Sequence, residues 1–355
     1  MKRAAKLTIG LVASLVLLAV MVYFVGFGET IDAARQTGLP AVLSLGGLLA
    51  ALLVCQAAAW KALNRAVGHR VGFGSLLGAT VVGLAGNIIT PSTYLGGEPG
   101  KVLYAGRRTG LPYEQLAGTV LLLKYVEALS FLLFVPAGTV VAIVGMEQAL
   151  FSGPGLWLGA AVLAIAAAAL AALVVLAVSL ARRWRPLTAL AGLLARAGIF
   201  RRFFSRLGVR ARRVEDQASG VFGRERSMVV PAFGLFLLTH VTMYLKPLLF
   251  FWLGWGKVLS PAELGLIFLT SQVLLAFQLT PSGVGTLDGG LFGMLAVSGI
   301  AITQPQCAAY LLCIRLWDGL TIAAGAALAA RVGVGLFAEP KPAEGQMART
   351  PTTKK

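Results

Sequence analysis

The sequence predicts an all-α, polytopic membrane protein with about six full transmembrane helices and two re-entrant helical hairpins. Of its 355 residues, 57% are hydrophobic and only 13% are charged, which leaves too little polar surface for a soluble protein of this length. Apolar runs recur, and each is long enough to cross a hydrocarbon core of ~30 Å as a helix. Two stretches rich in proline and glycine interrupt this pattern in the same way. The predicted spans are 7–28, 39–60, 115–145, 155–180, 229–254 and 307–330.

The first span, 7–28, follows the basic stretch "MKRAAK", which resembles the start of a signal peptide. Its apolar part is longer than the hydrophobic region of such peptides, and no cleavage site with small residues clearly ends it. We therefore expect a retained signal anchor, with the amino terminus in the cytoplasm.

The positive-inside rule decides how the chain continues. Run 7–28 then leads out of the cell, and run 39–60 returns to the basic stretch "KALNRAVGHR". If 71–90 crossed once more, the loop 181–228 would lie outside the cell. That loop holds twelve arginines and only three acids, so the rule places it in the cytoplasm.

A hairpin at 71–108 that enters the membrane and returns to the same side removes this conflict. The later spans then alternate, and a second hairpin at 259–302 enters from the outer side. Residues 1–335 form one integral membrane domain in this scheme, and 336–355 form a disordered cytoplasmic tail.

The two breaks are "TPSTYLGGEPGK" at 90–101 and "TPSGVGTLDGG" at 280–290. Pro91 and Pro281 lack a backbone donor, and each disfavours helical geometry in the residue before it. Glycines that permit a tight backbone reversal follow them, namely Gly96, Gly97, Gly283 and Gly285. Irregular backbone at membrane depth is tolerated only against protein or a wet cavity, so two breaks predict an interior polar site. The alternative is a pair of ordinary loops outside the membrane, each with a proline stop.

The two halves of the sequence also share a spacing of charged residues. Glu98 lies eight residues after the threonine of the first break, and Asp288 lies eight residues after that of the second. Each half continues with a base and, three positions later, an acid, which are Lys124 with Glu127 and Arg315 with Asp318. Three complete crossings separate the hairpins. Repeats with cores at about 71–130 and 259–322 would therefore run antiparallel, as in many transporters.

Charged residues inside the predicted membrane region are the candidates for a functional site, because each costs ~2.5–3.5 kcal/mol on insertion scales. They are Glu98, Lys101, Lys124, Glu127, Lys246, Asp288, Arg315 and Asp318, with His240 as a further polar partner. The pairs spaced by three residues can meet on one helix face. They either neutralise each other and fix helix packing, or they take part in function. Lys124 and Arg315 also suit a phosphate group.

Three of these residues have specific alternatives. Glu98 and Asp288 either contact a ligand or complement the dipole of the helix that each one starts. Lys246 either contacts a lipid headgroup or extends to the outer interface of the membrane.

Composition argues against several other classes of protein. The net charge of +17 is concentrated in the loop 181–228, which points to the anionic cytoplasmic leaflet, so no nucleic-acid partner is expected. The three cysteines show no metal-ligand spacing, and two histidines make a histidine-rich centre improbable. The sequence has no Walker A motif. We expect neither a metal nor a cofactor.

At these residues the sequence resembles the lysylphosphatidylglycerol synthase transmembrane-region family, also called the flippase-like or UPF0104 family. The specific stretches are "NIITPSTYLGGEPGKVLYAGRRTGLPYEQLAGTVLLLKYVEAL", "LLAFQLTPSGVGTLDGGLFGMLAVSG" and "YLLCIRLWDGL". The first family motif is matched by Pro91, Gly97, Glu98 and Lys101, and the second by Pro281, Gly283, Gly285 and Asp288. The chain departs from the family at Asp288, where glutamate is usual, and at Lys124, where an arginine is common.

The resemblance implies a flippase-like domain that moves lipids between leaflets. Fused members of the family carry a cytoplasmic synthetase, and we expect a stand-alone member without that domain here, because the stretch after residue 335 is short. We therefore expect a lipid flippase or transporter for a phospholipid, an aminoacyl-lipid, a glycolipid or a polyprenyl-type lipid, and not an enzyme. Two alternatives stay open: a non-transporting partner that recruits a lipid-modifying enzyme through the loop 181–228, and a membrane-embedded transferase with Glu98 or Asp288 as the base.

The expected partners are membrane lipids with an anionic or phosphate-bearing headgroup. A cytoplasmic lipid-modifying enzyme and a second copy of the chain are also compatible with the sequence. The expected location is the plasma (inner) membrane, with both termini in the cytoplasm.

Overall fold

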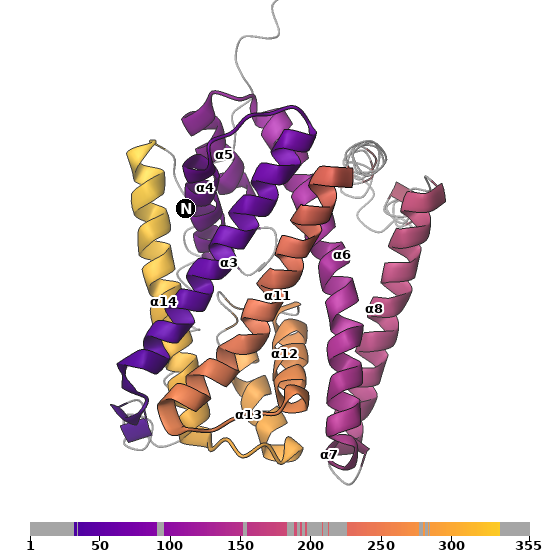
Figure 1. The fold of residues 1–355 in the computed structure, drawn as a ribbon, viewed down its shortest axis with the longest axis vertical. Coiled ribbons are helices and arrows are strands. Elements are labelled where there is room, and N and C mark those ends of the chain that lie inside the picture. Colours follow the sequence, from indigo (N-terminus) through magenta and orange to yellow (C-terminus); the bar gives the residue numbers. More distant parts are fainter. Residues whose placement is uncertain are drawn as a thin grey trace, which may run out of the picture.

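The computed structural model describes residues 32–33, 35–90, 96–151, 155–182, 188–189, 192–193, 196, 208, 212, 226–276, 280, 283 and 285–333. Every regular element among these residues is a helix, and together they form an elongated bundle (Figure 1). The helices are α3 (Gly38–Ala66), α4 (Phe73–Ile89), α5 (Glu98–Thr109), α6 (Tyr113–Gly145), α7 (Glu147–Phe151), α8 (Leu156–Arg182), α11 (Arg226–Trp255), α12 (Pro261–Ala276), α13 (Thr286–Ser298) and α14 (Gln304–Arg331).

Five of these helices, α3, α6, α8, α11 and α14, are long and apolar enough to cross a membrane. They coincide with five of the predicted spans, which confirms an all-α, multi-pass membrane protein. The sixth predicted span, 7–28, lies outside the described residues, as do the tail 336–355 and most of the loop 181–228.

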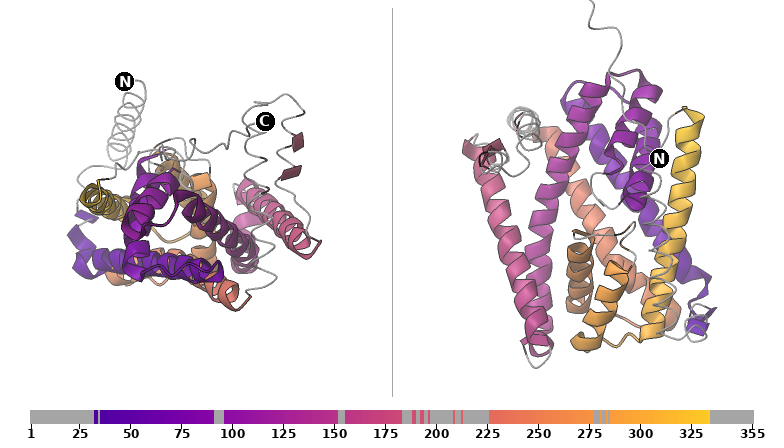
Figure 2. Two further views of the ribbon diagram at one scale, coloured as in Figure 1. Left: turned by 90° about the horizontal axis from the view of Figure 1, so that it is seen from above. Right: turned by 180° about the vertical axis from the view of Figure 1, so that it is seen from behind.

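Between the long helices lie two pairs of short ones. Helices α4 and α5 have 17 and 12 residues, and α12 and α13 have 16 and 13, which is less than the ~20 residues of a full crossing. The second helix of each pair ends near the end of the bundle at which the first helix begins (Figures 1 and 2). The pair α4 and α5 lies in the upper half of the bundle, and the pair α12 and α13 lies in the lower half (Figures 1 and 2).

Each short pair has its own apolar core. The core around α4 and α5 includes Trp60, Leu76, Tyr104, Leu123 and Phe236. The core around α12 and α13 includes Phe250, Phe251, Leu266, Leu291 and Tyr310. Helix α3 packs along α11, and α14 packs along α4, so the long helices hold the two halves together. Helix α8 lies against α6 at the edge of the bundle (Figure 2).

One close contact joins α14 to α3. The indole Nε1 of Trp317 donates a hydrogen bond to the carbonyl oxygen of Val42 at 2.9 Å. The ring then lies directly on Gly46, where a Cβ atom would overlap it, whereas a Cβ at the neighbouring Gly47 would meet nothing within 4 Å. The glycine at 46 therefore makes room for the tryptophan.

Replacing Gly46 with alanine is expected to destabilise the protein by about 1–3 kcal/mol, the usual cost of adding a group to a packed interior. The expected observable is a lower midpoint of thermal unfolding in detergent. Gly47→Ala is the matched control, because it adds the same methyl group to the same helix in open space. Equal midpoints for the two variants would show that Trp317 does not depend on Gly46.

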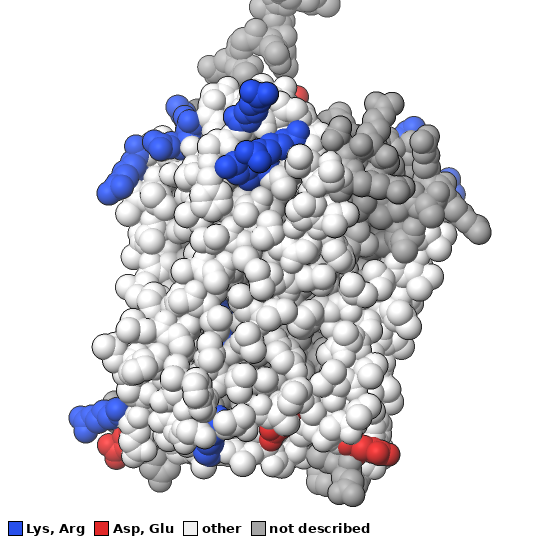
Figure 3. Space-filling model, in the orientation of Figure 1, with Lys and Arg blue, Asp and Glu red and all other residues white. Residues whose placement is uncertain are grey.

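On the face that Figure 3 shows, most charged side chains lie at the two ends of the bundle, and the wide band between them is almost free of charge. At the end where α3, α5 and α14 finish, the last turns carry basic residues, which are Arg65, Arg107, Arg108 and Arg331. At the other end, the first turns of α7 and α12 carry Glu147 and Glu263. This distribution is typical of a membrane protein with one strongly basic side.

Candidate functional site

The first group of buried charges lies where α5 begins. Glu98 is the first residue of α5, so its carboxylate complements the positive end of the helix dipole. Its Oε1 atom lies 3.1 Å from the Nζ of Lys124 on α6, and the same Nζ lies 2.9 Å from Oε2 of Glu127. Lys101 is one turn further along α5. We call these four residues the Glu98 cluster.

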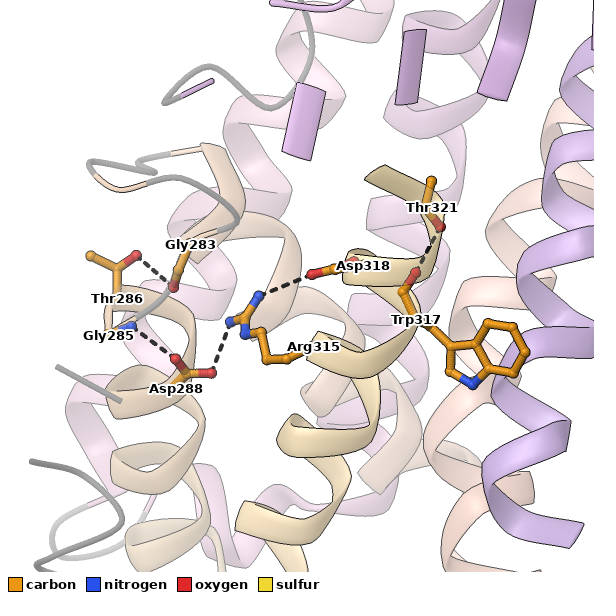
Figure 4. Close-up of polar contacts among 8 residues, drawn as sticks. All are labelled: Gly283, Gly285, Thr286, Asp288, Arg315, Trp317, Asp318 and Thr321. Carbon is orange, nitrogen blue, oxygen red and sulfur yellow. Dashed lines mark hydrogen bonds and ion pairs between the residues drawn. The ribbon is translucent and has the colours of Figure 1, made fainter. Parts of the chain in front are cut away.

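The second group has the same form at the start of α13 (Figure 4). Asp288 accepts a hydrogen bond from the backbone N–H of Gly285 at Oδ2, at 2.8 Å, and one from Nη2 of Arg315 at Oδ1, at 2.9 Å. Nη1 of Arg315 donates to Oδ2 of Asp318 at 3.2 Å. We call Asp288, Arg315, Asp318 and the nearby Lys246 the Asp288 cluster.

In both clusters an acid on the second short helix binds a base on the following long helix. The base in turn binds the acid three residues later. The pairs within α6 and within α14 are the ones that the sequence spacing predicted. The bridges from Glu98 to Lys124 and from Asp288 to Arg315 were not predicted, and they tie each short pair to the next long helix.

Lys101 is 4% exposed and lies among three helices. Its Nζ is 4.8 Å from the centre of the Trp60 ring on α3, which is a cation–π contact. Trp60 is held in place because its Nε1 donates to Oγ1 of Thr119 at 3.0 Å. A Cβ at Gly83 on α4 would lie only 3.2 Å from the Lys101 side chain, so the glycine leaves room for its stem.

Lys246 lies on α11, nine residues before the end of that helix. The acid with which its ammonium group interacts is Asp318 on α14. Both expectations for Lys246, a contact with a lipid headgroup and an extension to the outer interface, stay predictions.

His240 connects α11 to the Glu98 cluster. Its Nε2 is 3.1 Å from Oγ of Ser130, and Ser130 donates to the backbone carbonyl of Glu127 at 2.8 Å. The imidazole packs against Phe131 and Phe134, with ring centres 5.7 and 5.6 Å away. Sequence reasoning did not identify Ser130, although its position three residues after Glu127 places it on the same face of α6.

The glycines of the two breaks serve different purposes. Gly97 approaches the backbone of α4 so closely that a Cβ would overlap the carbonyl oxygen of Gly83, and its N–H donates to Oδ1 of Asn87 at 2.7 Å. The Asn87 amide also faces the Glu98 carboxylate. In the second break, Gly283 and Gly285 have positive φ angles of 67° and 86°.

The remaining predicted residues of the two breaks are one glycine and two prolines. At Gly96, a Cβ would overlap the Thr90 hydroxyl, so this glycine is also required by close packing. Pro91 and Pro281 lie outside the described residues. Among the residues that the structure describes, no group of three or more His, Cys, Asp or Glu side chains could hold a metal ion.

Comparison with known proteins agrees with this architecture. The family described as the lysylphosphatidylglycerol synthase TM region matches residues 7–332. A UPF0104 membrane protein of Methanothermobacter thermautotrophicus is 26% identical over 308 residues, which are 84% of this chain and 87% of that protein. No solved structure matches.

Proposed function

The chain belongs to the family of the lysylphosphatidylglycerol synthase transmembrane region, and from this membership we propose that it is a lipid flippase. It transfers a phospholipid, an aminoacyl-lipid, a glycolipid or a polyprenyl-type lipid between leaflets, and it acts as a transporter and not as an enzyme. The observation that carries the proposal is the pair of charged clusters in an otherwise apolar bundle.

The clusters are costly if they serve only to hold helices together. Each ionised side chain costs ~2.5–3.5 kcal/mol to place at the centre of a membrane helix. Well-packed apolar residues often replace a buried ion pair without loss of stability. Eight ionisable side chains in two matching clusters therefore support a role in binding the polar part of a lipid. Lys124 and Arg315 suit its phosphate group, while the acyl chains stay in the bilayer.

The basic end of the bundle faces the cytoplasm of a plasma-membrane protein, by the positive-inside rule. With this orientation, the pair α4 and α5 enters from the cytoplasm and the pair α12 and α13 from the outside. Both termini are cytoplasmic. The two halves are then inverted repeats, and a lipid headgroup passes between the clusters at the tips of the two short pairs.

The test is the rate of lipid transfer in proteoliposomes, measured as the exposure of a fluorescent headgroup to a quencher outside. We expect the double variant Glu98→Ala/Asp288→Ala to lose at least about tenfold in rate, because a hydrogen bond to a charged group contributes roughly 1.5–3 kcal/mol.

The matched control is Glu114→Ala/Glu147→Ala, which removes two exposed acids from the starts of α6 and α7. The control should transfer lipid at the wild-type rate. If the alanine variant does not fold, Glu98→Gln/Asp288→Asn keeps the side-chain volumes and gives the same test. Equal rates for the wild type and a folded variant would rule out both clusters as the lipid site.

A further inference from the structure

We propose that the two clusters have different roles, and this inference rests on the function proposed above. The Glu98 cluster is the site that binds and selects the lipid headgroup. In this conformation the charges of the Asp288 cluster already bind one another and hold α13 to α14, so this cluster does not take part in selecting the lipid. The headgroup that fits the Glu98 cluster combines an anionic phosphate oxygen with a neighbouring N–H or O–H donor.

The Asp288 cluster is closed because its central carboxylate already has partners on both sides. The Asp288 side chain is 0% exposed. One oxygen accepts from the N–H of Gly285, and the other accepts from Arg315 (Figure 4). The first of these bonds also caps the start of α13. A ligand that bound Asp288 would have to displace a helix cap or an ion pair.

The Glu98 cluster differs because one oxygen of its central carboxylate lacks such a partner among the described residues. Oε1 of Glu98 binds Lys124, whereas its buried Oε2 has no hydrogen-bond partner among the described residues. Lys101 is almost completely buried; its ammonium group contacts the Trp60 ring and interacts electrostatically with Glu98 and Glu127. An ammonium carries three hydrogen-bond donors, which a ring contact leaves available to an anionic ligand.

Oε2 of Glu98 and the ammonium group of Lys101 together indicate one kind of ligand. Glu98 and Lys101 are three residues apart on α5, so they lie on the same face of the helix. Lys101 offers donors to an anionic oxygen, and the amino-terminal end of α5 favours the same negative charge. Oε2 of Glu98 needs a donor at a short distance from that anion. A phosphodiester with an amine or a hydroxyl in its headgroup supplies both.

A site of this kind distinguishes lipids that share the phosphate group but differ in the hydrogen-bond donors of their headgroups. Phosphatidylethanolamine carries an amine donor, and phosphatidylglycerol carries hydroxyl donors. Phosphatidylcholine has a phosphate and a positive charge but no N–H or O–H donor in its headgroup. We therefore expect the protein to bind at least one of the first two lipids about tenfold more tightly than phosphatidylcholine, because a hydrogen bond to a carboxylate is worth about that factor.

The experiment measures binding of these three lipids, with identical acyl chains, to the purified full chain in detergent by native mass spectrometry. Glu98→Met should bring the three affinities together, since it removes the acceptor while Glu127 still pairs with Lys124. Lys101→Met should weaken all three. Asp288→Asn should change the three affinities by a common factor and so keep their order, because the Glu98 cluster that selects the headgroup is unchanged. If Glu98→Met does not fold, Glu98→Gln replaces it and should narrow the differences.

Each outcome decides one part of the inference. A preference for phosphatidylethanolamine or for phosphatidylglycerol identifies the donor as an amine or a hydroxyl. Equal binding of phosphatidylcholine by the wild type would overturn the inference, and so would a preference lost in Asp288→Asn but kept in Glu98→Met. Because binding is measured without transfer, a protein that selects lipids but moves none would refute the proposed flippase and leave this inference standing.

Discussion

Replacing Arg315 with leucine is expected to lower the free energy of unfolding by about 3–5 kcal/mol, the usual cost of breaking a buried ion pair from one side. Arg315 is the shared cation of Asp288 and Asp318. Without it, the fully buried Asp288 carboxylate keeps its bond to Gly285 as its one remaining hydrogen bond within the described residues, and a second acid lies one turn away on α14. The variant should show a much lower unfolding midpoint in detergent and a lower yield of monodisperse protein.

A second variant shows whether this loss comes from the uncompensated acids. Arg315→Leu/Asp288→Asn/Asp318→Asn removes all three charges, and the amide oxygen that it introduces at position 288 can still accept from the N–H of Gly285. It should recover much of the stability, because a neutral replacement of a buried ion cluster is often tolerated. The control Arg331→Leu removes an exposed arginine from the last turn of α14 and should change the free energy of unfolding by less than about 0.5 kcal/mol. If Arg315→Leu has the same unfolding midpoint as this control, the ion pairs of the Asp288 cluster do not hold α13 to α14.

The long helices could be predicted because their signal is local. An apolar run of sufficient length crosses a membrane whatever its neighbours are, and α3 and α14 coincide with their predicted runs. Some spans contain prolines, such as Pro136 in α6 and Pro247 in α11, and these spans were still predicted correctly as helices. Neighbouring helices and small local adjustments tolerate them within the membrane. The short pairs needed a further argument, which was the side of the membrane on which the arginines of the loop 181–228 must lie.

The clusters were predictable only in part. The pair Lys124 and Glu127 follows from the geometry of one helix, but its contact with Glu98 depends on how α5 docks against α6. Lys101 on α5 meets Trp60 on α3 because both helices pack against α4 and α6, and no local pattern in the sequence predicts that packing. The contact between Ser130 and His240 joins residues 110 positions apart. The equal spacing of acids and bases in the two halves was the sequence signal that an acid, a base and a second acid would be arranged alike in both halves.

Close backbone packing in the first short pair is what places Glu98 beside Lys124. A Cβ at Gly97 would overlap the carbonyl oxygen of Gly83, and a Cβ at Gly86 would lie 2.6 Å from the Cα of Gly97. These neighbours are backbone atoms, which cannot rotate away as a side chain can. Gly97 also donates to Asn87, so α4 and α5 are fixed together at the residue that precedes Glu98.

Gly97→Ala is therefore expected to separate α4 from α5 and to affect both stability and ligand binding. The loss of stability should exceed the roughly 1–3 kcal/mol of ordinary overpacking, since the strain falls on backbone atoms. The displacement of Glu98 from Lys124 should also remove the preference among the three lipids. Gly74→Ala is the matched control on α4, because a Cβ there meets nothing within 4 Å. It should be neutral or stabilise the helix by up to about 1 kcal/mol. If unfolding midpoints and lipid preferences are the same in the two variants, the short pair does not position the headgroup site through its glycines.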